Sequence, residues 1–296
     1  MTEERKGVLA IVATATIWGL SSIYYKALAE VPPLEMLSHR TVWSVVFFLA
    51  VLAAQRRVRE AVRSLARPAV RLPLLASAVM IAVNWLLFIV AIQQGRALEA
   101  SLGYYIFPLL AVALGFLVLG ERFTPRQSAA IGLAALAVVV LTVGTGTVPW
   151  LALAIAGSFG IYGVIKTRVP LGPMVSVFAE TLVLLPLALA WLAGLHAGAW
   201  SDLGGRAGGH FGHGLGMSAA LAFAGPLTGG PLVLFAYAAR RIPYATVGLT
   251  LYWNPTLQFA VAVALFGEPF SVWHAAAFAL IWSGLALYSW GSWRRA

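Results

Sequence analysis

The sequence predicts an all-α membrane protein with ten transmembrane helices arranged as two inverted five-helix repeats. Three observations predict this fold: the composition, ten long apolar runs, and a similarity between the two halves of the chain. Hydrophobic residues make up 61% of the 296 residues, charged residues make up only 10%, and the mean hydropathy is +0.88. Because so few polar residues cannot cover a water-soluble globule of this length, the composition indicates an integral membrane protein.

The ten apolar runs each have the length that a membrane-spanning helix needs, roughly 17 to 25 residues. Backbone amides in hydrocarbon must be satisfied within the segment, which favours helices, and no run shows the alternation of a barrel strand. The first run could instead be a cleaved signal peptide, but it is longer than a typical apolar signal region and a second run follows almost at once. The predicted spans are residues 7–28, 33–54, 72–93, 98–119, 126–144, 148–167, 172–194, 217–239, 243–266 and 271–291.

The positions of the basic residues orient the chain in the membrane. If the N-terminus is cytoplasmic, 16 of the 20 Lys and Arg residues fall in cytoplasmic segments, as the positive-inside rule favours. We therefore expect both termini in the cytoplasm. The basic run QRRVREAVR at residues 55–63 is better explained as an anchor on anionic lipid headgroups than as a nucleic-acid site. The chain has no cysteine, which fits a bacterial inner-membrane protein.

The two halves of the chain share a sequence pattern. When residues 84–123 are placed over residues 231–270, eleven of 40 positions are identical, including a Tyr, a Pro and the endings GERF at 120–123 and GEPF at 267–270. The pattern divides the chain into residues 1–144 and 145–296, with a Gly- and His-rich outer loop at 195–216. Five helices are an odd number, so the second half must enter the membrane from the opposite side. Inverted repeats are typical of secondary transporters, although a duplication kept for packing alone is the alternative.

Several of these segments resemble a known family. The string NWLLFIVAIQQGRALEASLGYYIFPLLAVALGFLVLGERF (84–123), with LSHRTVW (37–43), IWG (17–19), NPTL (254–257) and GEPF (267–270), is similar to the RarD branch of the EamA, drug/metabolite transporter (DMT), superfamily. The resemblance covers essentially the whole chain. It implies a ten-helix inverted-repeat carrier of bacterial inner membranes that exports small metabolites, in a superfamily that includes amino-acid exporters of the YddG type.

Ionisable residues inside predicted spans are candidates for contact with cargo, because burying a charge there costs about 2.5 to 3.5 kcal/mol on insertion scales. Arg40 and Glu180 lie at corresponding positions of the second and seventh spans, so Arg40 could bind a carboxylate and Glu180 an ammonium group or a proton. Structural pairing of each charge is the alternative. For His39 a local hydrogen bond is expected, although it stays a candidate for the path. Glu99, at the start of the fourth span, is expected to stabilise a helix N-terminus and is otherwise a proton-exchange candidate.

Polar and aromatic residues near prolines form a second group of candidates. A proline removes a backbone hydrogen bond, so a helix can bend where polar side chains gather. The path-lining candidates from this group are Trp18, Asn84, Trp85, Tyr104, Tyr105, Tyr162, Tyr252, Trp253 and Asn254. The expected hinges are Pro108, Pro226, Gly229, Gly230, Pro231 and Pro255, and the stretch from Pro226 to Pro231 is expected to form either a hinge or a broken helix.

Other classes of protein fit the sequence less well. His196, His210 and His213 lie in a Gly-rich loop without cysteine, so we expect a linker and no metal or other cofactor. The chain has no phosphate-binding loop of a primary pump and no HExxH or GxSxG motif of an enzyme, so we expect neither. A channel, a drug-efflux permease or a scaffold without transport stays open. We expect a monomer in the lipid bilayer that binds a small-molecule substrate, because one chain already holds both halves of the path.

Overall fold

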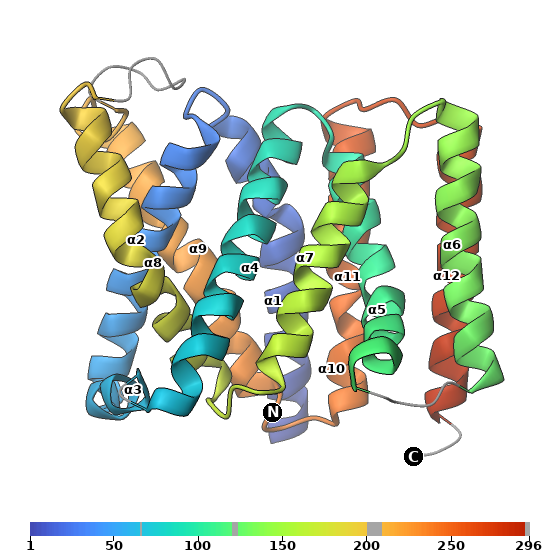
Figure 1. The fold of residues 1–296 in the computed structure, drawn as a ribbon, viewed down its shortest axis with the longest axis horizontal. Coiled ribbons are helices and arrows are strands. Elements are labelled where there is room, and N and C mark those ends of the chain that lie inside the picture. The colour runs from blue at the N-terminus through green and yellow to red at the C-terminus, as the bar shows by residue number, and fades with distance from the viewer. Residues whose placement is uncertain (66, 120–123, 200–208, 294–296) are drawn as a thin grey trace.

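The computed structural model describes residues 1–65, 67–119, 124–199 and 209–293, and within these ranges all regular structure is helical. The ribbon forms a bundle of long, roughly parallel helices that overlap one another in this view, and the first helix begins at the end of the bundle where the last helix ends (Figure 1). The elements are α1 Glu3–Ala27, α2 Pro33–Ala54, α3 Val58–Leu65, α4 Pro68–Gln93, α5 Ala97–Leu119, α6 Pro125–Thr145, α7 Trp150–Lys166, α8 Pro173–His196, α9 Leu215–Ala238, α10 Tyr244–Leu251, α11 Trp253–Ala260, the π-helix η2 Val261–Leu265 and α12 Val272–Trp293.

Local sequence explains where many helices begin. Four of them, α2, α4, α6 and α8, start with proline, which lacks the amide hydrogen that would otherwise stay unpaired in the first turn. Helix α6 also has a capping box, in which Thr124 and Gln127 bond each other's backbone amides. Within the described residues, seven helices are long and apolar enough to cross a membrane: α1, α2, α4, α5, α6, α8 and α9. Two further apolar helices, Trp150–Lys166 and Val272–Leu287, are shorter.

Helices occupy each of the ten predicted ranges, with two differences. The short helix α3 is an addition; it carries Arg59 and Arg63 and lies at the same end of the bundle as the termini (Figure 1). The range 243–266 is divided into α10, α11 and η2, with Tyr252 at the junction of α10 and α11. Pro255 lies in the first turn of α11, where it cannot donate a hydrogen bond back into α10, so the chain bends there.

Helix α9 is not broken. It runs without interruption from Leu215 to Ala238, through both Pro226 and Pro231, so the broken-helix interpretation of this stretch was wrong. Neighbouring helices hold it: Thr14 of α1 donates a hydrogen bond to the carbonyl of Pro231, and Gly229 lies directly against Phe47 of α2. A proline inside a membrane helix is tolerated where neighbours satisfy the backbone in this way.

Small residues let helices from the two halves approach closely. Helix α2 packs on α9 at Gly225, where a Cβ atom would lie 2.2 Å from the carbonyl oxygen of Trp43. Gly19 of α1 packs on Leu257 of α11 in the same manner. Helices α6 and α12 pack on each other at one edge of the bundle (Figure 1). Such close contacts are how apolar helices associate when water does not drive them together.

Of the two matching tetrapeptides, GEPF is described and GERF lies outside the described residues. Glu268 of GEPF accepts hydrogen bonds from the backbone amides of Ala97 and Leu98, each at 2.7 Å. These amides open α5, which belongs to the other half of the chain. A carboxylate at a helix N-terminus is stabilising, so Glu268 fixes the start of α5.

We predict that Gly225→Ala destabilises the protein by about 1 to 3 kcal/mol, because the added methyl group overpacks the α2–α9 contact. The matched control is Gly230→Ala on the same helix, where a Cβ would meet nothing within 4 Å. Alanine is the better helix former, so the control keeps or raises stability. Thermal unfolding in detergent measures both variants, and equal changes in the two would contradict the packing described for α9.

Candidate functional site

A cavity of about 780 Å³ lies between the two halves of the chain, within the usual range for a site that binds small molecules. Helices from both halves contribute to its walls, and most of the lining is apolar or aromatic. The lining residues are Trp18, Ser21, Tyr25, Arg40, Ile81, Asn84, Trp85, Phe88, Tyr104, Phe107, Pro108, Phe159, Tyr162, Val177, Leu227, Thr228, Leu232, Phe235, Gly248, Leu249, Leu251, Tyr252, Asn254, Pro255 and Gln258.

Arg40 is the one lining residue in the described chain that carries a full charge at neutral pH. Its guanidinium carbon lies 4.0 Å from the ring centroid of Trp85 and 5.7 Å from that of Tyr25. Aromatic faces attract a cation but do not neutralise it. Its Nε atom is buried without a hydrogen-bond partner, and no carboxylate of the described residues forms a salt bridge with it. Arg40 is therefore a cation with no counter-ion.

Asn84 connects three helices at the cavity wall. Its Nδ2 donates to the carbonyl of Ile155 at 3.0 Å and to the hydroxyl of Ser158 at 3.1 Å, both on α7. Its Oδ1 accepts a hydrogen bond of 3.2 Å from the hydroxyl of Tyr104 on α5. The amide is thus satisfied from both sides, and it fixes the Tyr104 hydroxyl at the cavity surface.

Glu180 lies behind the cavity wall and is fully buried. One carboxylate oxygen accepts hydrogen bonds from Lys166 and from Ser77, each at 2.7 Å, and the other accepts one from Tyr162 at 3.2 Å. Lys166 also bonds the hydroxyl of Ser176. Tyr162 lines the cavity, so Glu180 is one hydrogen bond away from it. Sequence analysis did not predict this pair, because Lys166 and Glu180 lie on different helices, 14 residues apart.

Most of the predicted path residues line the cavity, and four do not. Trp18, Arg40, Asn84, Trp85, Tyr104, Tyr162, Tyr252 and Asn254 line it, together with the expected hinges Pro108 and Pro255. The four others are His39, Tyr105, Glu180 and Trp253. Tyr105 bonds Thr256 between α5 and α11 at 2.6 Å, and the half-exposed Trp253 donates from its indole to Thr16 of α1 at 3.1 Å. Both residues therefore make helix contacts outside the cavity.

His39 belongs to a different cluster, at the end of the bundle opposite the termini. Its Nε2 lies 3.8 Å from Glu35, and its ring stacks on Phe211. The buried Glu35 accepts hydrogen bonds from the backbone amide of His210 at 2.5 Å and from its ring Nδ1 at 2.8 Å. Within the described residues no group of three acidic or histidine side chains could hold a metal ion. The spacing of Glu35 and His39, one helical turn apart, was the signal that sequence analysis missed.

Glu99 lies at a helix end. Its carboxylate forms a 2.5 Å salt bridge with Arg96 and accepts a hydrogen bond of 3.2 Å from the backbone amide of Leu151 in the first turn of α7. Glu99 lies in the first turn of α5, but the N-terminus that it stabilises through this hydrogen bond is that of α7, whereas the sequence led us to expect that of its own helix. It does not line the cavity.

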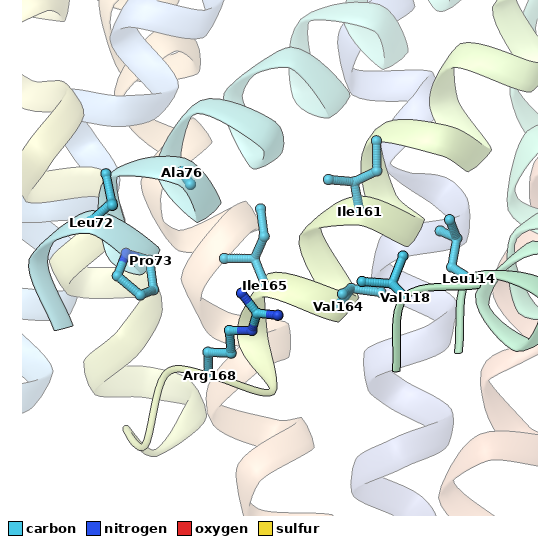
Figure 2. A pocket seen from close by; sticks show the side chains of 9 residues that line it. All are labelled: Leu72, Pro73, Ala76, Leu114, Val118, Ile161, Val164, Ile165 and Arg168. Carbon is cyan, nitrogen blue, oxygen red and sulfur yellow. The ribbon is translucent and has the colours of Figure 1, made fainter. Parts of the chain in front are cut away.

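A second, smaller hollow of about 350 Å³ lies on the outer surface between α4, α5 and α7. Figure 2 shows its apolar side chains, with Arg168 at one end beside Ile165. Leu72, Ile161 and Val118 are strongly exposed there. Apart from Arg168, no polar side chain of the described residues lines this groove, so it resembles a surface for lipid chains more than a site for a polar cargo.

We predict that Lys166→Met destabilises the protein by about 3 kcal/mol, because it leaves the Glu180 carboxylate buried without its cation. Adding Glu180→Gln to this variant recovers part of the loss, since a neutral amide still bonds Ser77 and Tyr162. Arg57→Met, which breaks the exposed ion pair with Glu60, serves as the control and changes stability by less than about 1 kcal/mol. A double variant no more stable than Lys166→Met would refute the account of this pair.

Comparisons with known proteins agree with this architecture. A family model described as the EamA-like transporter family matches residues 5–143. An uncharacterized transporter of Vibrio cholerae is 39% identical, over 97% of this chain and 93% of that protein. Protein RarD of Salmonella typhimurium is 38% identical, over 97% and 95%, and the uncharacterized transporter YojE of Bacillus subtilis is 36% identical, over 99% and 97%.

The fold is also similar to a solved structure. One crystal structure aligns with a TM-score of 0.59 and 19% identity, over 96% of this chain and 97% of the other. At this identity the similarity shows a shared fold and nothing about function. The three relatives, by contrast, are 36% to 39% identical to this chain over nearly their full length. The chain therefore belongs to the EamA-like transporters of the drug/metabolite transporter superfamily, in the RarD-like branch.

Proposed function

We propose that this protein is a secondary carrier that exports small metabolites, amino acids or related compounds, across the bacterial inner membrane by alternating access. In this proposal the chain crosses the membrane ten times, as two inverted five-helix repeats at residues 1–144 and 145–296. In this orientation both termini face the cytoplasm. Helix α3 lies at the same end of the bundle as the start of α1 and the end of α12 (Figure 1), and 16 of the 20 Lys and Arg residues fall in segments predicted to be cytoplasmic. The loop at 195–216 faces the periplasm.

One observation carries the proposal: equivalent positions of the two repeats line the same cavity. At the spacing of 147 residues found in the sequence, six pairs have both members in the lining. They are Ile81 and Thr228, Trp85 and Leu232, Phe88 and Phe235, Tyr104 and Leu251, Phe107 and Asn254, and Pro108 and Pro255. A site built symmetrically from inverted repeats is what a carrier needs to expose it to either side in turn.

Helix packing supports the same interpretation. Helix α1 packs on α9 and α11. Its counterpart α7 packs on α4, which is the counterpart of α9, and on α5, which is the counterpart of α10 and α11 together. Helices α2 and α8 pack on each other, as do α6 and α12, so each of these contacts is its own counterpart. The arrangement is the one expected of two halves related by a two-fold axis in the membrane plane.

The break at Tyr252 suggests where the carrier moves. Tyr252, Asn254 and Pro255 all line the cavity, and the π-helix η2 begins directly after the end of α11. Breaks and π-helical turns concentrate at functional sites because they lower the cost of bending. We propose that α10 and α11 change their mutual angle as the cavity opens to one side or the other. Pro108 is the equivalent hinge of the other repeat, and in α9 the corresponding role falls to Gly230 beside Pro231.

Arg40 is the residue that we propose to bind a carboxylate of the cargo. Glu180 reaches the cavity through Tyr162, so it is the coupling candidate of this proposal, in preference to Glu99 at its helix end. Direction follows from gradients, because a carrier without coupling runs either way.

A drug-efflux permease, or a channel without a saturable site, is the second candidate function. The aromatic lining of the cavity would suit an apolar drug. A Pseudomonas aeruginosa relative, 31% identical, is named chloramphenicol-sensitive protein RarD.

Counterflow in proteoliposomes tests the carrier. We expect saturable uptake of labelled amino acid or related metabolite, accelerated by unlabelled cargo inside, and we expect Trp85→Ala to slow it about tenfold, equivalent to about 1.4 kcal/mol of lost contact. Trp253→Ala is the matched control, since Trp253 lies outside the cavity. Flux that never saturates and shows no acceleration would favour the channel.

A further inference from the structure

The charges around the cavity define its cargo more narrowly than the family does. We propose that the preferred cargo is an organic acid with a single negative charge, an apolar or aromatic body and a neutral hydrogen-bond donor, and that zwitterions bind more weakly. This inference rests on the proposed carrier function and specifies the substrate class of the same cavity.

The first step is the uncompensated cation. Arg40 is about nine-tenths buried, its Nε has no hydrogen-bond partner, and its guanidinium lies over the rings of Trp85 and Tyr25 with no carboxylate in a salt bridge to it among the described residues. A buried cation without a counter-ion is unfavourable in a membrane-embedded protein, and a bound anion removes that penalty. The planar guanidinium also suits a carboxylate, which it can bind through two parallel hydrogen bonds.

The second step is the missing anion. No Asp or Glu lines the cavity among the described residues, so an ammonium group entering it would lose water without gaining a counter-charge. Glu180 lies at the eighth position of α8, as Arg40 lies at the eighth of α2, and its carboxylate is behind the wall, hydrogen-bonded to the lining residue Tyr162. Its charge is already matched by Lys166, and its oxygens accept from Ser77 and Tyr162 as well.

The third step concerns the neutral polar groups. The oxygen of Asn84 is taken by Tyr104, and the hydroxyl of Thr228 donates to the carbonyl of Ala224. Gln258 donates to Asn254, but its own Oε1 is buried and has no partner. An unsatisfied amide oxygen accepts a hydrogen bond from a hydroxyl or amide of the cargo. Among the described lining residues, Arg40 therefore offers a site for an anion and the amide oxygen of Gln258 offers a site for a neutral donor.

The fourth step is the apolar body. Rings of both halves, among them Trp18, Phe88, Phe159 and Phe235, make up much of the remaining wall, and the volume of about 780 Å³ accommodates an aromatic ring with a short side chain. An aromatic 2-hydroxy acid combines the three features.

Binding of a matched series to the purified protein in detergent tests the proposal, with tryptophan fluorescence as the readout because Trp18 and Trp85 line the cavity. The probes are 3-phenyllactate, its methyl ester, phenylalanine and phenethylamine. With the wild-type protein we expect 3-phenyllactate to bind at least tenfold more tightly than each of the other three. This comparison needs no variant, so it holds even if a change at Arg40 prevents folding.

Variants then identify the group responsible. Arg40→Gln should abolish the preference for 3-phenyllactate over its methyl ester, and Arg40→Lys should keep part of it, because a lysine retains the charge without the planar fork. Equal or tighter binding of phenylalanine, binding of none of the probes, or an unchanged preference in Arg40→Gln would overturn the proposal.

The charge selectivity and the carrier function are tested separately. If phenylalanine binds as well as 3-phenyllactate and both show counterflow in proteoliposomes, the charge selectivity is wrong and the carrier stands. If 3-phenyllactate binds with the expected preference but shows no saturable counterflow, the site is as proposed and the carrier function is wrong.

Discussion

The structure depends on one constraint: polar groups buried in an apolar surrounding must find partners, and several of these partners come from the opposite half of the chain. Glu180 bonds Ser77, Asn84 bonds the α7 backbone, and Glu35 bonds His210. Glu268 caps α5 across the same boundary. In each of these bonds the donor and the acceptor lie in different halves of the chain, so the polar group loses this partner if the halves separate. The halves are thus held as one unit by polar contacts at the ends and behind the walls of the cavity, and the wall that faces the cavity is left mainly to aromatic side chains.

The departure from symmetry is as informative as the symmetry. Arg40 and Glu180 hold the same place in equivalent helices, yet Arg40 faces the cavity without a counter-ion whereas Glu180 is neutralised by Lys166 on α7. A cavity that had both charges free would bind a zwitterion or would let the two charges attract each other. By matching one charge internally, the fold leaves a single unbalanced group, and a single unbalanced group is what gives a small apolar cavity its selectivity for charge.

Prolines in this bundle show that a sequence signal can have opposite outcomes. Pro226 and Pro231 lie within a continuous α9, where Gly225 and Gly229 pack on α2 and Thr14 bonds the backbone. Pro255 lies at the break between α10 and α11, next to the open volume of the cavity. Around the prolines of α9 the neighbouring helices satisfy the backbone and pack closely, so the helix stays continuous, whereas the helix that contains Pro255 is interrupted at Tyr252.

Hydrophobic run length and internal repetition are local patterns that need no knowledge of neighbours, so they were enough to predict the helical class and the positions of the apolar segments. Ten of the 25 residues that line the cavity, Arg40 and Asn84 among them, were also candidates from the sequence. Which charges are paired could be read only from the tertiary structure. Lys166, the partner of Glu180, lies 14 residues away on the preceding helix, and His210, the partner of Glu35, lies 175 residues away. Contacts between side chains of different helices leave no periodic signal in the sequence. The continuity of α9 likewise depends on the packing of a neighbouring helix, so the sequence of α9 alone does not predict it.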